Sequence, residues 1–239
     1  MAEPSYSVRR SDRARRARLT VTPDGQAVVV LPRRAPAAMA QQLVAAHATW
    51  LRRQVDRIQA ANARIAERPS LGGGRSLSVG GVRYRVAVSS GVSTRSSVAV
   101  HPPADGESGT LEVRQGHGSA APPSEILDRW LRREARRVLV GRVAALAPVV
   151  GVAVPIVTIR AQRSRWGSAS RSGRLSLNWR LILAPPWVLD YVVIHELAHL
   201  RVAGHSVRFW AVVRSHTPHT EAARAWLRAN HAELMAALD

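Results

Sequence analysis

The sequence predicts an α+β fold in two lobes, and three observations lead to this class. Short runs with β-type alternation dominate the first hundred residues and flank one long helical pattern. The second half runs in a different order, with a helix, short strands and then several helices. Between the halves, residues 101–123 are rich in Gly, Pro and Ser, which is typical of a linker. We therefore expect lobes over 18–100 and 124–239.

The N-terminal lobe is expected to be strand-rich around one long helix. Its two turns have a physical basis, because Pro23 presets φ before Gly25, and the Gly80-Gly81 pair tolerates positive φ between alternating runs. Apolar residues recurring every three or four positions predict the helix. The expected segments are a basic stretch over 1–17, two extended runs over 19–32, the helix over 36–66 and a hairpin over 76–89.

The C-terminal lobe is expected to hold a small antiparallel sheet among helices. Ser124 suits the N-cap of its first helix, and Pro148 with Gly151 suits its end. The Pro185-Pro186 pair can open a later helix, because proline is tolerated in a first turn. The expected segments are a helix over 124–146, strands over 155–160 and 174–183, and helices starting near 185, 206 and 220.

Composition excludes several classes of protein. With 239 residues, 46% hydrophobic and 21% charged, the chain has the composition of a globular protein. It has no cysteine, so disulfides and thiolate metal sites are ruled out. No apolar run reaches the roughly 18 residues of a membrane span. Charges occupy the N-terminal positions where a signal peptide is apolar, so we expect a cytoplasmic protein.

The net charge of +19 comes from arginine alone, since all 35 basic residues are arginine. That usage, with abundant Ala, Val and Gly, is typical of a GC-rich genome. An arginine-rich surface still attracts polyanions, so we expect non-specific nucleic-acid binding at low salt. For the block from Arg9 to Arg18, a solvated face is the favoured interpretation over a nucleic-acid arm.

The most informative stretch is HELAH, residues 195–199. In a helix, positions i and i+4 project from one face, so His195 and His199 can bind one ion. Glu196 lies one step round the helix and can reach a water on that ion. The flanking residues are apolar, so the helix is expected to be buried, where unpartnered polar groups are costly. The pattern indicates a metal site with Glu196 as the general base.

A catalytic zinc needs three protein ligands and one open position. The favoured third ligand is His205, because Gly204 lets the chain turn out of the helix and bring a side chain back to the metal. Other candidates remain open and lie further along the chain: Glu221, Glu233, His216 and His219.

Several short motifs occur in order through the second half: WGS, LNW, APP, DYV, HELAHL and GHS-x-x-FW. With the basic opening strand and a helix bearing Trp50, they make the chain resemble the YgjP-like zinc metallopeptidases, relatives of the SprT and WLM groups. The resemblance extends from about residue 8 to 235, and 90–122 is its least matched part. One departure is Ala169, where the family usually has a cysteine. No expected zinc ligand is lost by it.

The resemblance implies a zincin-like C-terminal lobe that binds one zinc per chain through His195, His199 and His205. It also strengthens the choice of His205. In zincins a strand beside the active helix usually pairs with an extended peptide, and residues 163–180 are the candidate hairpin. Four nearby side chains could line the cleft or stabilise the transition state, although each could equally serve in packing, in a turn or on the surface: Arg165, Trp166, Asn178 and Tyr191.

Three functions follow as hypotheses. The first is a zinc metallopeptidase, whose partner is a peptide or protein substrate. The second is a zinc hydrolase of a nucleotide or other phosphorylated small molecule, although no Walker-type phosphate loop is present. The third is a nucleic-acid-associated protease similar to SprT relatives, although no zinc finger or sequence-reading module is recognisable.

Overall fold

The structure is a computed structural model that describes residues 5–104, 108–170 and 172–239. It divides into two compact units, Met1–Arg68 and Pro69–Asp239. The division differs from the predicted linker at 101–123. Those residues include the end of one strand and the whole of another in a single sheet of the second unit.

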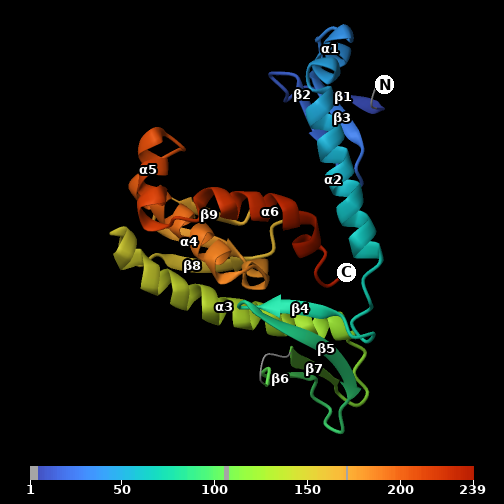
Figure 1. Ribbon diagram of the computed structural model, residues 1–239, viewed down its shortest axis with the longest axis vertical. Coiled ribbons are helices and arrows are strands. Elements are labelled where there is room, and N and C mark those ends of the chain that lie inside the picture. The colour runs from blue at the N-terminus through green and yellow to red at the C-terminus, as the bar shows by residue number, and fades with distance from the viewer. Residues whose placement is uncertain (1–4, 105–107, 171) are drawn as a thin grey trace. The chain divides into compact units, whose positions relative to one another are not determined.

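The first unit is a three-stranded sheet with two helices (Figure 1). Its central strand pairs in parallel with the first strand and antiparallel with the second, so the order is β1-β3-β2. Gly25, with φ of 84°, makes the predicted turn between the second and third strands. The elements are β1 (Tyr6–Ser11), β2 (Arg18–Val21), β3 (Ala27–Pro32), α1 (Ala38–Ala46) and α2 (Ala48–Ala66).

The single helix predicted over 36–66 is two helices. His47, with φ of −117° and ψ of 17°, departs from helical geometry and separates them. One apolar core still joins this unit, because Val29 and Leu31 of β3 pack with Val44 of α1 and Leu51 of α2.

The second unit begins with a four-stranded sheet of order β4-β5-β7-β6. The predicted hairpin is present, with Gly80 and Gly81 at φ of 61° and 89° between its strands. The inner strands are parallel, and their pairing joins residues that are far apart along the chain, such as Tyr84 and Gly109. The strands are β4 (Ser76–Val79), β5 (Val82–Ser90), β6 (Ser97–His101) and β7 (Gly109–Gln115).

One long helix, α3 (Pro123–Val150), follows this sheet and contacts both sheets of the unit as well as its later helices (Figure 1). Its N-cap is Pro122, with no side-chain cap, rather than the predicted Ser124. Pro148 lies inside the helix, and Gly151 ends it in the left-handed conformation at φ of 77°. The helix buries Leu131, Leu139 and other apolar side chains in the main core.

A three-stranded sheet follows, made of β8 (Ile156–Arg160), β9 (Gly167–Ser170) and β10 (Arg174–Asn178). Its order is β8-β10-β9, with β10 parallel to β8 and antiparallel to β9, so the sheet is mixed rather than the predicted antiparallel one, and β9 is an edge strand. The strand predicted over 174–183 ends at Asn178, and the chain continues as a 3₁₀ helix, η1 (Trp179–Leu183).

Three helices complete the unit: α4 (Pro186–Arg201), α5 (Val207–His216) and α6 (Thr220–Met235). The α4 helix packs against α3, α5, α6 and β9, which makes it the centre of this unit. Asp190 of α4 forms a two-point ion pair with Arg142 of α3, in which Nη2 and Oδ2 are 2.7 Å apart. Among the described helices, none has the length and apolar character needed to cross a bilayer.

Candidate metal centre

The α4 helix carries three of the predicted site residues on its last two turns. His195, Glu196 and His199 belong to a helix that buries most of its apolar side chains, including Val192, Val193, Ile194, Leu197 and Ala198. The apolar side chains of the helix pack in the main core and hold its backbone in place. The polar side chains that the helix carries therefore start from fixed positions.

His205 reaches the same place from outside the helix. The chain leaves α4 at Val202 and turns at Gly204, whose φ of 72° favours glycine. Ser206 then caps α5 by accepting a hydrogen bond from the backbone N–H of Phe209 at 3.3 Å. The glycine turn and the cap together hold His205 between two helices.

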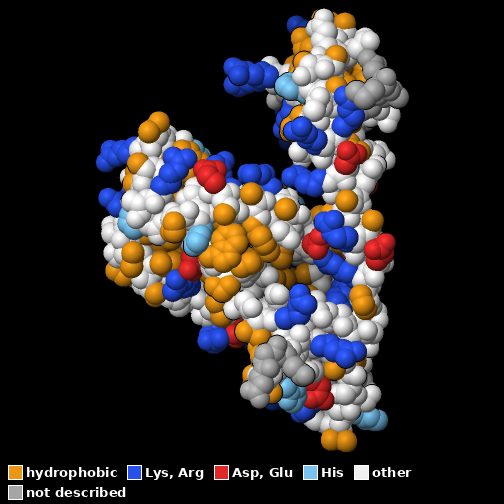
Figure 2. All heavy atoms as spheres, viewed as in Figure 1, with side chains coloured by type: hydrophobic (Ala, Val, Ile, Leu, Met, Phe, Trp, Pro, Cys, Tyr) orange, Lys and Arg blue, Asp and Glu red, His pale blue; other side chains and the backbone are white. Residues whose placement is uncertain are grey.

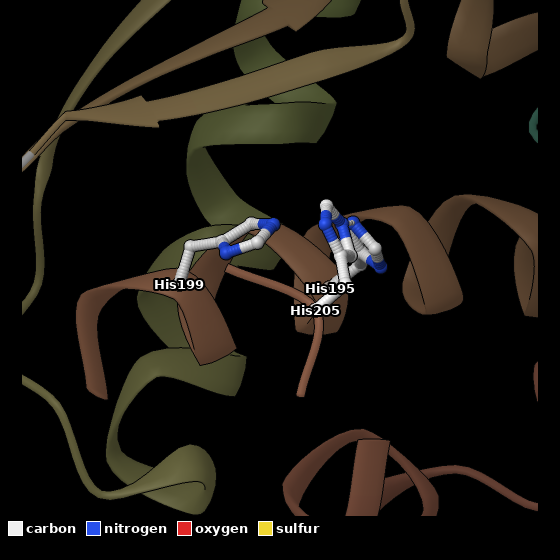
Figure 3. Close-up of side chains that lie close together, drawn as sticks. All are labelled: His195, His199 and His205. Atoms are coloured by element: carbon white, nitrogen blue, oxygen red, sulfur yellow. Dashed lines mark hydrogen bonds between the residues drawn. The ribbon is translucent and has the colours of Figure 1, made fainter. Parts of the chain in front are cut away.

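The three histidines converge (Figure 3). One ligand atom from each lies within 4.8 Å of the others, and Nε2 of His195 lies 3.3 Å from Nε2 of His205. Two nitrogens bound at about 2.0–2.1 Å to one tetrahedral ion would be about 3.3–3.4 Å apart. The donor set and this spacing therefore fit a single tetrahedral metal ion.

An aromatic residue that the sequence analysis did not single out packs against all three histidines. Phe209 of α5 is fully buried and stacks on the His199 ring, with centroids 4.3 Å apart. Its centroid is 4.9 Å from those of both His195 and His205. Phe209 therefore fixes the ring orientations. The only sequence signal for it was its place four residues after His205 in the GHS-x-x-FW motif.

The surroundings favour neutral imidazoles. Burial lowers the pKa of His195 to about 4, and the charges of His199, His205 and Arg224 would oppose its protonation further. Burial also lowers the pKa of His199, with His205 adding to the effect. A neutral imidazole keeps the lone pair that binds a metal, so the site is ready for an ion near neutral pH.

Glu196 is almost fully buried, at 7% exposure. Desolvation raises the pKa of its carboxyl to about 7, against the opposing charge of Arg165. It lines a cleft of about 440 Å³ together with the three histidines, Arg165 and residues 167–170 of β9. A carboxyl with a pKa near 7, beside a group of metal-binding donors, is suited to exchanging a proton at neutral pH.

Gly167 of β9 lies directly against this carboxyl. A Cβ built on Gly167 would lie 2.6 Å from both Cγ and Oε1 of Glu196, which is shorter than van der Waals contact allows. The absence of a side chain at 167 therefore makes room for the Glu196 carboxyl. Sequence reasoning missed this role, although Gly167 lies in the quoted WGS motif.

We expect Gly167→Ala to lower any activity that depends on proton transfer by Glu196 at least about tenfold, because the added Cβ displaces the carboxyl and removes its positioning. Metal content should stay unchanged, since no histidine is displaced. Steady-state rates and elemental analysis test both statements. Gly141→Ala in α3 is the matched control, because its Cβ would have no atom within 4 Å. Equal activity in the two variants would contradict the role of Gly167.

The other predicted cleft residues take different places. Arg165 lines the cleft, whereas Trp166 is partly buried and meets His231 edge-on, with centroids 5.5 Å apart. Asn178 is fully buried, and its Nδ2 donates to the Gln162 carbonyl at 2.6 Å, so it holds the loop between β8 and β9, while its Oδ1 accepts from the Arg180 N–H and caps η1.

Tyr191 packs one turn before His195, with ring centroids 5.8 Å apart. Burial raises the pKa of its hydroxyl to about 12, so it stays protonated. It is not among the residues that line the cleft, and neither are Trp166 and Asn178.

The alternative metal ligands lie outside the histidine group. Glu221 pairs with Arg214 and Arg224, at 3.2 and 3.1 Å. His216 bonds to the Val212 carbonyl at 2.7 Å, and His219 meets the Trp187 ring at 5.5 Å. Within the part of the chain that the structure describes, the group of side chains able to hold a metal includes His205. It contains no carboxylate, so Glu233 also lies outside it.

Comparison with known proteins identifies a family for this chain. The family model of the YgjP-like, metallopeptidase domain matches residues 15–230. No match is found among curated proteins. Among solved structures, the metallopeptidase zymogen abylysin of Pyrococcus abyssi is similar at 23% identity and a TM-score of 0.32, over 41% of this chain and 87% of that chain. Because the family model spans most of the sequence, the chain belongs to the YgjP-like family by its metallopeptidase domain.

Proposed function

We propose that the protein is a zinc metallopeptidase in which His195, His199 and His205 hold the metal and Glu196 is the general base. The observation that carries the proposal is the convergence of three histidines and one buried carboxyl on a single cleft. Membership of a metallopeptidase family supports the same reaction class.

Zinc is the metal that this donor set favours. Three neutral imidazoles in a tetrahedral arrangement suit it, whereas magnesium and calcium prefer oxygen ligands. When bound, it would lower the pKa of a water toward about 7 and polarise the scissile carbonyl.

Glu196 would move the proton in this reaction. Its carboxylate accepts the proton of the attacking water and passes it to the amine that leaves. With a pKa of about 7, the group is partly ionised at neutral pH, so it can both accept and return a proton. Gly167 allows the carboxyl to lie against β9, and Arg165 stabilises its ionised form.

An extended peptide is the substrate shape that fits the cleft. The edge strand β9 borders it along its whole length, Gly167 to Ser170. Beyond β10, no other described strand pairs with β9, so one row of its backbone groups can pair with a peptide. Arg165 beside the metal ligands would favour an acidic side chain in that peptide.

The metal is tested directly by elemental analysis. We expect about one zinc per chain after gentle purification, because three imidazoles are the usual protein share of a catalytic zinc site. The His199→Ala variant should lose it, and Gly141→Ala should retain it. A wild-type protein that takes up no metal even when zinc is offered would contradict the site.

The substrate class is tested by a screen against a peptide library and a nucleotide panel, with Glu196→Gln as control. Peptide cleavage that disappears in Glu196→Gln is the expected result. Phosphate release that disappears instead would favour the nucleotide hydrolase. Any activity that survives the substitution unchanged does not come from this cleft.

A further inference from the structure

The three-stranded sheet of the first unit has one covered and one open face. Side chains alternate along a strand, and Val29 and Leu31 of β3 face the helices in the apolar core. Val30 must then face the other way. It is only 4% exposed, yet it is not part of the core that its neighbours form. Something other than the helices covers Val30.

The strand register identifies two of the covering groups. Arg9 of β1 and Arg18 of β2 both pair with Val30, from either side. Residues paired across a sheet project from the same face, so the two arginines flank Val30 on the open face. In this row of three residues, the apolar Val30 lies in the middle and one arginine lies on each side of it.

The loop between β1 and β2 supplies three further arginines. It must cross the end of β3, because the strands that it joins lie on opposite sides of that strand. The loop carries Arg13, Arg15 and Arg16, and these line the same hollow as Arg9, Arg18 and Val30. The hollow has a volume of about 510 Å³. Five guanidinium groups from two strands and one loop therefore surround a single hollow.

Among the residues that the structure describes, the side chains of these five arginines have no acidic partner. Each arginine is exposed, and no ion pair or hydrogen bond joins its guanidinium group to another described residue. Neighbouring arginines contrast with them, since Arg33 pairs with Asp12 at 3.2 Å and Arg10 donates to the carbonyls of Arg33 and Ala35. Asp12, the acidic residue of the loop, is thus engaged elsewhere and does not line the hollow.

The charge is also concentrated in this unit. Residues 1–68 hold 13 arginines and 5 acidic residues, a net charge of +8, whereas 69–239 hold 22 and 11, a net charge of +11 over a segment more than twice as long. Basic side chains are scattered over the face in Figure 2, where acidic ones are few. The hollow differs from that scattered charge because its five arginines share one concave surface.

We propose that this arginine hollow, defined by Arg9, Arg13, Arg15, Arg16 and Arg18, binds the phosphate backbone of a nucleic-acid strand, in place of the solvated face that the sequence alone favours for this block. Guanidinium groups match phosphate oxygens in geometry and charge. A single phosphate group carries only about −1.5 to −2, which leaves most of the five positive charges unmatched. A chain of phosphates matches them. No aromatic ring lines the hollow, so binding is through the backbone and independent of base sequence.

An anionic membrane is the competing polyanion, and the hollow fits it less well. Peripheral membrane binding combines basic residues with large apolar side chains that enter the lipid boundary. Apart from Val30, the apolar residues of the hollow are the small Ala14 and Ala17, and Val30 is buried at its floor. The hollow is therefore a concave basic surface that offers no large exposed apolar side chain to a lipid boundary.

The test measures anisotropy of labelled single-stranded RNA and DNA of about 20 nucleotides, titrated with the full chain. We expect sequence-independent binding that persists at about 0.15 M salt. The Arg13→Gln/Arg15→Gln/Arg16→Gln variant should bind at least about tenfold more weakly, and its salt slope should fall by about 2, since each lost phosphate contact contributes about 0.7. These substitutions lie in a loop and leave the sheet unaltered.

The matched control removes the same charge elsewhere in the unit. Arg34→Gln/Arg53→Gln/Arg57→Gln changes three exposed arginines that do not line the hollow, and it should bind within about threefold of wild type. Equal weakening in both triple variants would overturn the proposal, because net charge alone would then explain binding. The proposal would also be overturned if the wild-type chain bound phosphatidylserine vesicles but no oligonucleotide at the same salt, or if it bound neither of them.

A second measurement uses the wild-type chain, so that a poorly folded variant cannot hide the answer. An arginine-specific dicarbonyl reagent is applied with and without the oligonucleotide, and modified positions are identified by mass spectrometry. Protection of Arg13, Arg15 and Arg16, with Arg34 and Arg53 unprotected, is the expected result. Uniform protection, or none, would contradict the assigned surface. Neither experiment depends on the metal site.

Discussion

Glu196→Gln is expected to lower peptide hydrolysis by about 10²–10⁴, the usual contribution of a general base, while zinc content stays at the wild-type level. Glutamine keeps the size of the side chain and fits the same space against Gly167, but it cannot accept the proton of the attacking water. Steady-state rates and elemental analysis on the same preparation measure both. Loss of zinc in this variant would show that Glu196 helps to bind the metal, which would contradict its assignment as a general base outside the ligand set.

The same substitution changes stability with pH in the metal-free protein. The carboxyl has a pKa of about 7 in the folded chain, whereas the ordinary pKa of a glutamate, which applies in the unfolded chain, is 4.5, so the unfolded chain ionises first as pH rises. Wild-type stability therefore falls between about pH 4.5 and 7 through this group, and the loss is complete above pH 7. Glutamine has no such loss, so at pH 8 the variant should be more stable by about 3 kcal/mol. Urea unfolding of both metal-free proteins at pH 5 and pH 8 measures the difference, and a difference that did not grow with pH would contradict the burial of an ionisable carboxyl.

His205→Ala is expected to reduce zinc affinity by more than about 10²-fold. Changes to the outer partners of metal ligands alone cost about 10–100-fold, so removing a ligand should cost more. Competition with a chromophoric chelator measures the affinity.

Glu221→Ala and Glu233→Ala are the controls for His205→Ala, since both carboxylates lie outside the histidine group. They should bind zinc nearly as the wild type does. If a carboxylate variant lost zinc while His205→Ala retained it, the assignment of the third ligand would be wrong.

Much of the site was predictable because its main residues are local in sequence. His195, Glu196 and His199 lie within two turns of one helix, and a glycine turn places His205 nearby. Gly167 and Phe209 were missed because their roles depend on β9 and α5 packing against α4. Tertiary contacts of this kind leave no periodic signal in the sequence.

The fold was predicted least well where pairing is non-local. Residues 101–123 have the composition of a linker, yet β7 pairs in parallel with β5, and this joins the expected linker to the sheet before it. The helix predicted over 36–66 breaks at His47, since apolar spacing does not record a change of backbone direction. Asn178 was expected near the cleft, but its amide donates to the carbonyl groups of Gln162 and Arg165 in the neighbouring loop.

The place of His205 outside the helix has a consequence for the kinetics of metal exchange. Two of the proposed ligands lie on a buried helix, whereas His205 is exposed and follows a glycine turn with open space around it. We expect the metal to arrive first on His195 and His199 and to leave by release of His205. The residence time of the ion would then depend on how often residues 202–206 open. A proline or a bulky residue in that turn would alter the exchange rate without changing any ligand.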